Sequence, residues 1–145
     1  VHMANIAQTV NVLQAMILTE GDKMVKTPSY HVFDLYKVHQ DADVVASYGD
    51  ESDTLSYTAS KKDGLISISL CNYSLTDTQT LDVAGEFGDT ITEARYISAD
   101  KMDEHNDFEH PENIVIKNFD GAKLANGQLS ITMPPMSVAT IRIPE

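Results

Sequence analysis

Residues 55–72 read LSYTASKKDGLISISLCN, and this stretch decides the fold. In its first half Leu55, Tyr57 and Ala59 alternate with serine and threonine, which is the period-two pattern of a strand with one apolar face. Lys62-Asp63-Gly64 then indicates a tight turn, and a second alternating run over 65–70 follows it. The stretch predicts two antiparallel strands joined by a hairpin.

Further strand candidates and turn signals follow along the chain to its last residues. The turn dipeptides Asn126-Gly127 and Pro134-Pro135 separate the later candidates. Several short strands at regular spacing indicate a mainly β fold, an antiparallel β-sandwich of jelly-roll type. The additional strands are expected at 79–83, 91–97, 113–119, 128–133 and 138–143.

The first forty residues have a different pattern, which predicts helix over most of 3–39. A short apolar run at 15–18 indicates a buried strand, and 19–22 indicate a loop. Thr27-Pro28 is a typical helix start, with Thr as N-cap and Pro in the first turn. A helix, a strand and a second helix form an α/β unit, which needs neighbouring strands from elsewhere. The first helix is predicted from the spacing of Met3, Ile6, Ala7, Val10 and Leu13.

Charge and cysteine content restrict the function classes. The net charge is −12, and Arg95 and Arg142 are the only two arginines, so we expect neither nucleic-acid binding nor attachment to an anionic membrane. No apolar run has the length of a membrane span, and the N-terminus has no signal-peptide pattern. Cys71 is the one cysteine, and we expect it to be a buried, inert thiol. A chain without an internal disulfide favours a reducing compartment, hence the cytoplasm.

Residues 100–112 contain acids and histidines but match no metal template. The spacing fits neither a zinc site nor the alternating oxygen ligands of a calcium loop, so a solvated loop is expected and no metal or cofactor is assigned. His31 and His39 share a helix face without the glutamate of a zinc-protease motif, and we interpret them as structural or partner-facing histidines. The side chains that could serve as ligands by residue type are Glu104, His105, Asp107, Glu109 and His110.

Gln8, Asn11 and Gln14 are polar residues in the otherwise apolar first helix. From periodicity alone they form a solvent-facing side, or one of them lines a site in a larger domain. Asn72-Tyr73-Ser74 has the form of a glycosylation acceptor, but it lies in a predicted strand and nothing indicates secretion.

Several runs resemble a known family. Residues 3–15 (MANIAQTVNVLQA) and 27–40 (TPSYHVFDLYKVHQ) are similar to the C-terminal part of α-L-arabinofuranosidases of glycoside hydrolase family 51. The stretch 105–112 (HNDFEHPE) and the closing residues 129–143, with MPPMSV at 133–138, extend the resemblance over nearly the whole chain. The middle strands, about 42–98, are not diagnostic.

The resemblance implies two parts: residues 1–40 as the last elements of a truncated (β/α)₈ catalytic barrel, and 41–145 as a C-terminal β-sandwich. It implies a parent enzyme that releases terminal non-reducing α-L-arabinofuranosyl groups from arabinoxylan or arabinan. Retaining hydrolysis needs two carboxyl groups about 5 Å apart, and in the family both glutamates lie upstream of these elements. We therefore expect this chain alone not to be an enzyme and assign no catalytic residue in it.

The resemblance also implies one substrate contact. Gln8 matches the glutamine of the family's Ala-Gln-x-Val-Asn segment and is expected to orient a sugar hydroxyl. Glu20 and Asp22 follow the predicted strand, so they are expected at the edge of the cleft. The implied partners are the rest of the parent barrel, arabinose-containing oligosaccharides bound through the parent, and further copies of the parent in a homo-oligomer.

Two other interpretations remain at the level of sequence. One is a carbohydrate-binding β-sandwich module, which the lack of tryptophan makes less attractive. The other is an interaction domain used in oligomer assembly.

Overall fold

The structure, a computed structural model, describes residues 6–49 and 52–145. Its regular elements are short strands, one α-helix and a 3₁₀ turn, and the paired strands run antiparallel. In chain order they are β1 (Ile17–Glu20), β2 (Lys23–Lys26), α1 (Pro28–Tyr36), the 3₁₀ turn η1 (Lys37–His39), β3 (Asp43–Val44), β4 (Leu55–Lys62), β5 (Leu65–Asn72), β6 (Gln79–Ala84), β7 (Glu93–Ser98), β8 (Lys117–Asn118), β9 (Ala122–Ala125), β10 (Gln128–Met133) and β11 (Ser137–Pro144).

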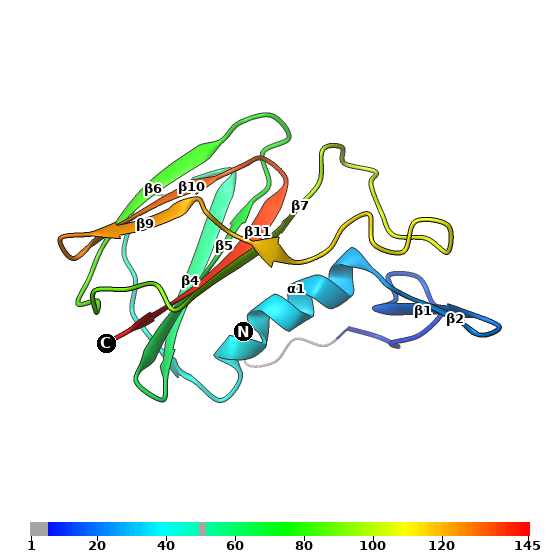
Figure 1. Ribbon diagram of the computed structural model, residues 1–145, viewed down its shortest axis with the longest axis horizontal. Coiled ribbons are helices and arrows are strands. Elements are labelled where there is room, and N and C mark those ends of the chain that lie inside the picture. Colours follow the sequence, from blue (N-terminus) through cyan, green and yellow to red (C-terminus); the bar gives the residue numbers. More distant parts are fainter. Residues whose placement is uncertain (1–5, 50–51) are drawn as a thin grey trace.

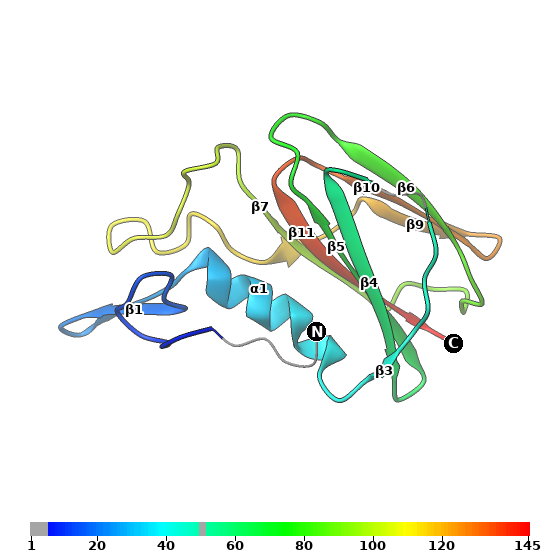
Figure 2. The ribbon, with the colours of Figure 1, turned by 180° about the vertical axis from the view of Figure 1, so that it is seen from behind.

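The elements form three layers. A six-stranded sheet has the order β3-β4-β5-β11-β7-β8, and a three-stranded sheet, β6-β10-β9, packs on one of its faces. Helix α1 lies across the other face, and the β1–β2 hairpin projects beyond the end of that helix (Figure 1). The same arrangement from behind shows β3 and β4 at the edge of the large sheet (Figure 2). The mainly β sandwich predicted from the alternating strands is confirmed.

The main core lies between the two sheets and follows the alternation of the strands. In β5, Ile68 and Leu70 point into this core, while Ser69 between them faces the helix and contacts His39. Residues with almost no exposed surface contribute most to the hydrophobic stabilisation of this core. The fully or nearly buried members are Ile68, Leu70, Phe119, Leu129, Ile131, Met133, Ala139, Ile141 and Ile143.

Helix α1 begins where the sequence predicts and is fixed by apolar and ionic contacts. Pro28 occupies its first turn, and Leu35 is fully buried against Ile97 and Ile114. The Arg95 guanidinium on β7 also lies 3.8 Å from the Asp34 carboxylate of α1. The helix is therefore held directly against the large sheet.

Two predicted hairpin turns are confirmed by their backbone angles. Asp63 and Gly64 have φ of 54° and 72°, and Asn126 and Gly127 have φ of 53° and 73°. Positive φ at both central residues is the requirement of a type I′ turn, which Asp-Gly and Asn-Gly pairs meet at low cost. The first turn joins β4 to β5, and the second joins β9 to β10.

The predicted first helix is wrong over its described part. Residues 6–14 form turns, with positive φ at Gln8 (59°), Asn11 (53°) and Gln14 (61°), and Met3 lies outside the described residues. A left-handed residue at every third position is incompatible with a right-handed helix. The predicted strand at 15–18 is displaced to β1, and its partner is the unpredicted β2 in an antiparallel hairpin. The helix–strand–helix unit is accordingly a loop, a hairpin and a helix.

The predicted strand over 113–119 is also largely wrong. Only Lys117–Asn118 pair in a sheet, because the backbone of Ile114 is bound by a side chain instead. Asn106 Oδ1 accepts from the Ile114 N–H at 2.7 Å, and Asn106 Nδ2 donates to the Ile114 carbonyl at 2.8 Å. The short strands β3 and β9 were not predicted.

Candidate functional site

The candidate site is the loop of residues 6–16, which carries the predicted sugar contact Gln8. Gln8 is exposed, and its backbone is left-handed with φ of 59°. A side-chain-bearing residue in this region costs of order 1 kcal/mol or more, and such strain often occurs at functional sites. The role of Gln8 in orienting a sugar hydroxyl stays a prediction.

Asn11 fixes this loop to β1 through its side chain. Asn11 Nδ2 donates to the carbonyl of Thr19 at 3.1 Å and to Thr19 Oγ1 at 2.8 Å. The Thr19 N–H donates to Asn11 Oδ1 at 2.7 Å. One amide side chain therefore holds three polar groups of a single residue, and it acts here as a clamp.

Backbone hydrogen bonds close the loop from its other end. The carbonyl of Thr9 accepts from the N–H groups of Met16 at 3.0 Å and Ile17 at 3.1 Å. The Asn11 N–H donates to the Ile17 carbonyl at 3.1 Å. Thr9 directly follows Gln8, so these bonds fix the position of the backbone on the C-terminal side of Gln8.

The loop is joined in turn to the start of α1. Thr27 Oγ1 donates to the carbonyl of Ala15 at 2.7 Å. The sequence predicts Thr27 as the N-cap of the helix, and it does occupy that position, but its side chain makes no cap hydrogen bond to α1. Ala15 in the loop and Val25 in β2 are both nearly fully buried. The Gln8 loop, the hairpin and the helix therefore form one connected unit.

Asn106 connects the long β7–β8 segment to the same unit. Its Nδ2 donates to the carbonyl of Lys26, the last residue of β2, at 2.8 Å, in addition to its two bonds with Ile114. Asn106 is 2% exposed, so these bonds form away from solvent. Asn106 lies in the stretch 105–112 that resembles the arabinofuranosidase family, but no role for it is predicted from the sequence.

The other residues predicted near the cleft lie at the hairpin tip. Glu20 ends β1 and pairs with Lys23 in the hairpin register, while Asp22 lies in the turn, and all three are exposed. Glu20 directly follows the clamped Thr19. The backbone next to Gln8 is bound at the start of β1, through Met16 and Ile17, whereas Glu20 lies at the other end of that strand.

The two predicted structural histidines are indeed packed into the fold. Burial, with a smaller effect of the Lys26 charge, lowers the pKa of His31. Burial likewise lowers the pKa of His39, whose ring lies between Ser60 on β4 and Ser69 on β5. Both groups favour the neutral form in the folded protein.

The acidic segment 100–112 forms an irregular loop, as predicted. N–H donation from His110 and Glu109 lowers the pKa of Asp107, with a further contribution from the His110 side chain. Among residues 6–49 and 52–145, no group of three or more His, Cys, Asp or Glu side chains is placed to hold a metal ion. Within the same ranges no helix is long and apolar enough to cross a membrane.

Two further sequence features have structural explanations. Burial raises the pKa of the Cys71 thiol, which keeps it protonated and poorly nucleophilic. Asn72, in the glycosylation-like triplet, is 1% exposed. Its Nδ2 donates to the carbonyls of Asp77 and Pro134, both at 2.9 Å, so the amide nitrogen is not available for modification.

The fold defines the class of the protein as a β-sandwich domain. A helix lies on the outer face of its larger sheet, and the strained Gln8 loop is fastened to the β1–β2 hairpin and to the start of that helix. The chain belongs to the alpha-L-arabinofuranosidase C-terminal domain family, whose sequence profile matches residues 1–137. It is 39% identical to an intracellular exo-alpha-L-arabinofuranosidase of Bacteroides ovatus, over 97% of this chain and 30% of the relative.

Solved structures give the same result. An arabinofuranosidase of glycoside hydrolase family 51 from Xanthomonas axonopodis pv. citri superposes with a TM-score of 0.86 at 35% identity, over 99% of this chain and 31% of that one. An alpha-L-arabinofuranosidase from Thermotoga maritima shares the fold with a TM-score of 0.82 at 21% identity, over 96% and 33% of the two chains. This chain thus spans about a third of the length of these relatives.

Proposed function

We propose that these residues are the C-terminal domain of a retaining α-L-arabinofuranosidase and brace its catalytic barrel. The parent hydrolyses terminal non-reducing α-L-arabinofuranosides, and its acid/base and nucleophile glutamates lie in the part of the parent outside these residues. The observation that carries the proposal is the 39% identity, over 97% of this chain, to a relative named as an exo-alpha-L-arabinofuranosidase. Residues 1–40 belong to the barrel in this proposal, and 41–145 form the bracing sandwich.

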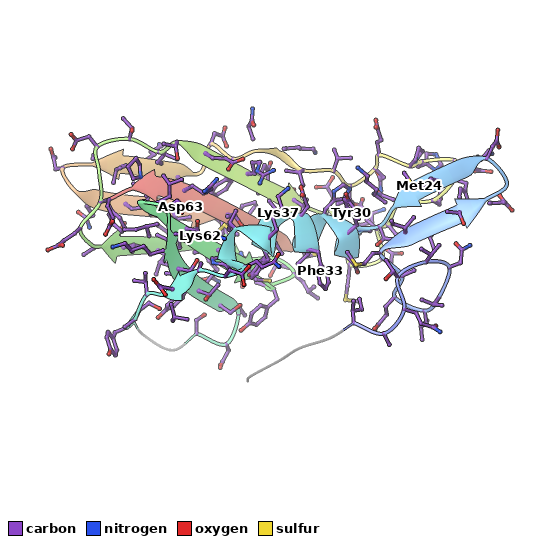
Figure 3. All side chains as sticks on the ribbon, turned by 90° about the horizontal axis from the view of Figure 1, so that it is seen from below. Met24, Tyr30, Phe33, Lys37, Lys62 and Asp63 are labelled. Atoms are coloured by element: carbon purple, nitrogen blue, oxygen red, sulfur yellow. The ribbon has the colours of Figure 1, made fainter. Side chains whose placement is uncertain are left out.

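In this proposal the outer surface of α1 and β2 is where residues 1–40 contact the rest of the barrel, while the sandwich braces α1 from its other side. Met24 is 58% exposed and Phe33 is 49% exposed, although the opposite side of α1 is buried on the sheet. Figure 3 shows Tyr30, Phe33 and Lys37 along the helix, with Met24 beyond its end on the hairpin. We call Met24, Tyr30, Phe33 and Lys37 the helix face, and we propose that the rest of the parent covers it, because the matched relatives are about three times as long.

The activity is tested with the full-length parent and an aryl α-L-arabinofuranoside. We expect hydrolysis with retention of configuration by the parent and no turnover by the purified 145-residue chain. A parent that leaves the arabinofuranoside intact contradicts the proposed activity. Turnover by the isolated chain contradicts the placement of both catalytic glutamates outside it.

The bracing role is tested separately with a matched pair of substitutions. Phe33 and Tyr73 are both 49% exposed, and Tyr73 directly follows β5 and is not one of the residues of the helix face. Phe33→Asp in the full-length parent is expected to lower the melting temperature by several degrees, as burial of a charge in an interface does, while Tyr73→Asp changes it little. In the isolated chain both substitutions are expected to be nearly neutral. Equal effects of the two substitutions in the parent contradict the coverage of the helix face.

Other occupants of the helix face give different results. Saturable binding of arabinoxylan oligosaccharides by the isolated chain favours the carbohydrate-binding module instead. Light scattering that shows concentration-dependent association of the isolated chain favours a second copy. We propose that the parent forms homo-oligomers through surfaces outside the helix face, and that it works in the cytoplasm, which is supported by the word intracellular in the name of the Bacteroides ovatus relative.

A further inference from the structure

The Gln8 loop is a piece of irregular backbone that the surrounding structure must hold in a strained form. Gln8, Asn11 and Gln14 all have left-handed backbones, within seven residues. Asparagine tolerates this region better than most residues, but glutamine has no such preference. The conformation at Gln8 therefore depends on contacts made by its neighbours and not on its own preference.

Asn11 provides contacts of the required kind and number. Its amide group makes three hydrogen bonds, of 2.7 to 3.1 Å, to the N–H, the carbonyl and the hydroxyl of Thr19. Thr19 is a residue of β1, whose register with β2 is fixed over four residue pairs. The clamp thus fastens the loop to a regular element, which is how a binding residue on a loop acquires a defined position.

We propose that Asn11 is the positioning residue for Gln8, holding its backbone so that the amide side chain meets a hydroxyl of the arabinofuranosyl group. This inference rests on the proposed function, because it gives Gln8 a sugar to bind. Asn11 itself acts only through Gln8, since its own amide is engaged by Thr19.

The test is a double-mutant cycle in the full-length parent, with kcat/KM on an aryl α-L-arabinofuranoside as the readout. Gln8→Ala and Asn11→Ala are each expected to lower kcat/KM by about tenfold, within the range that misplacement of a contacting group produces. In the Gln8→Ala background, Asn11→Ala is expected to change kcat/KM by less than about twofold, because the group that it positions is already absent.

Asn126 supplies a matched control for the backbone effect. It is also an exposed asparagine with φ of 53°, identical to that of Asn11, but it lies in the β9–β10 turn. Asn126→Ala places alanine in the same unfavourable backbone region and is expected to leave kcat/KM unchanged. Asn11→Gly removes the clamp while permitting the left-handed backbone, so it is expected to lose as much activity as Asn11→Ala.

The outcomes separate the two proposals. An active parent in which the losses from Gln8→Ala and Asn11→Ala multiply contradicts the positioning role and leaves the proposed function intact. Full activity of Asn11→Gly also contradicts it, because backbone preference then explains the effect. A parent without arabinofuranosidase activity contradicts the proposed function, and the positioning role with it.

Discussion

The imidazole of His39 lies against Ser69, with 2.8 Å between His39 Nε2 and the Ser69 hydroxyl oxygen. Ser69 Oγ lies 2.7 Å from Thr140 Oγ1, which lies 3.4 Å from the carbonyl of Leu35 near the end of α1. On the other side of the ring, Nδ1 lies 2.6 Å from Ser60 Oγ. If the histidine proton is on Nε2, these contacts form one continuous series of hydrogen bonds. In it Ser60 donates to the ring, the ring donates to Ser69, and the series ends at the Leu35 carbonyl, so that each hydroxyl donates once. His39 therefore connects the helix to three strands of the large sheet.

The stability of the fold is predicted to fall in acid because of this ring. Burial lowers the pKa of His39 from 6.5, so below about pH 6.5 the unfolded chain takes up a proton that the folded chain resists. The stability that this group contributes is thus fully present above pH 6.5 and is lost as the pH falls from there toward the folded pKa, by at most about 1.4 kcal/mol per pH unit. His31, whose pKa is also lowered, acts in the same direction.

Urea denaturation of the 145-residue chain between pH 8 and pH 5 measures this effect. His39→Asn is expected to be less stable than the native sequence at pH 8 and to lose less of its stability on acidification. His105→Asn is the control, because His105 is exposed. Parallel pH profiles for the native sequence and His39→Asn contradict the assignment.

Asn106→Ala is predicted to destabilise the fold by about 3 kcal/mol, at roughly 1 kcal/mol for each lost hydrogen bond. The substitution leaves the carbonyls of Lys26 and Ile114 without their donor. Asn113→Ala removes one exposed 3.3 Å bond and is expected to change stability by less than about 0.5 kcal/mol. Chemical denaturation of both variants checks the difference, and similar values for the two contradict it.

Ile141→Ala is predicted to cost about 2–5 kcal/mol, the range for deletion of a fully buried aliphatic side chain. Ile141 has no exposed surface and lies in β11 at the centre of the large sheet. Leu75→Ala removes a side chain of similar size that is 55% exposed, so a much smaller loss is expected. Comparison of the two unfolding midpoints at equal denaturant slope measures the contribution of the main core.

The β4–β5 turn offers a prediction that involves backbone alone. Gly64 has φ of 72°, and a methyl group added there meets nothing within 4 Å. Gly64→Ala is therefore expected to cost about 1 kcal/mol through its backbone angle and not through a clash. Asp63→Asn, which creates the Asn-Gly pair that type I′ turns favour, is expected to be neutral or slightly stabilising. Thermal unfolding of the two variants tests both signs, and a destabilising Asp63→Asn contradicts the turn assignment.

The sandwich could be predicted from sequence because its signals are local. The alternation around Ile68 and the dipeptides at 63–64 and 126–127 depend only on neighbouring residues, and the structure confirms them. Residues 113–116 have a strand-like composition, but the amide of Asn106, eight residues earlier, binds the backbone of Ile114 in place of a strand partner. Such competition between a side chain and a sheet has no periodic signature.

The candidate site was harder to predict for the same reason. The apolar spacing from Ile6 to Leu13 is typical of a helix, yet Asn11 uses its amide on Thr19, eight residues away. The family resemblance predicts a role for Gln8, but it does not predict the left-handed turn in which this residue lies. Asparagine and glutamine at every third position in an apolar stretch were the available signal, since side-chain amides compete for backbone groups.

The position of β11 has a consequence for biosynthesis. Ser137–Pro144 pairs with β5 on one side and β7 on the other, so the centre of the large sheet is made by a strand that is translated after both of its neighbours. Until then β5 and β7 each present an unpaired edge, which is where strands of different chains associate. Nascent molecules of this domain are therefore expected to need chaperone protection until residues 137–144 have been translated, and translational arrest before residue 137 should produce an aggregating species and not a partly folded domain.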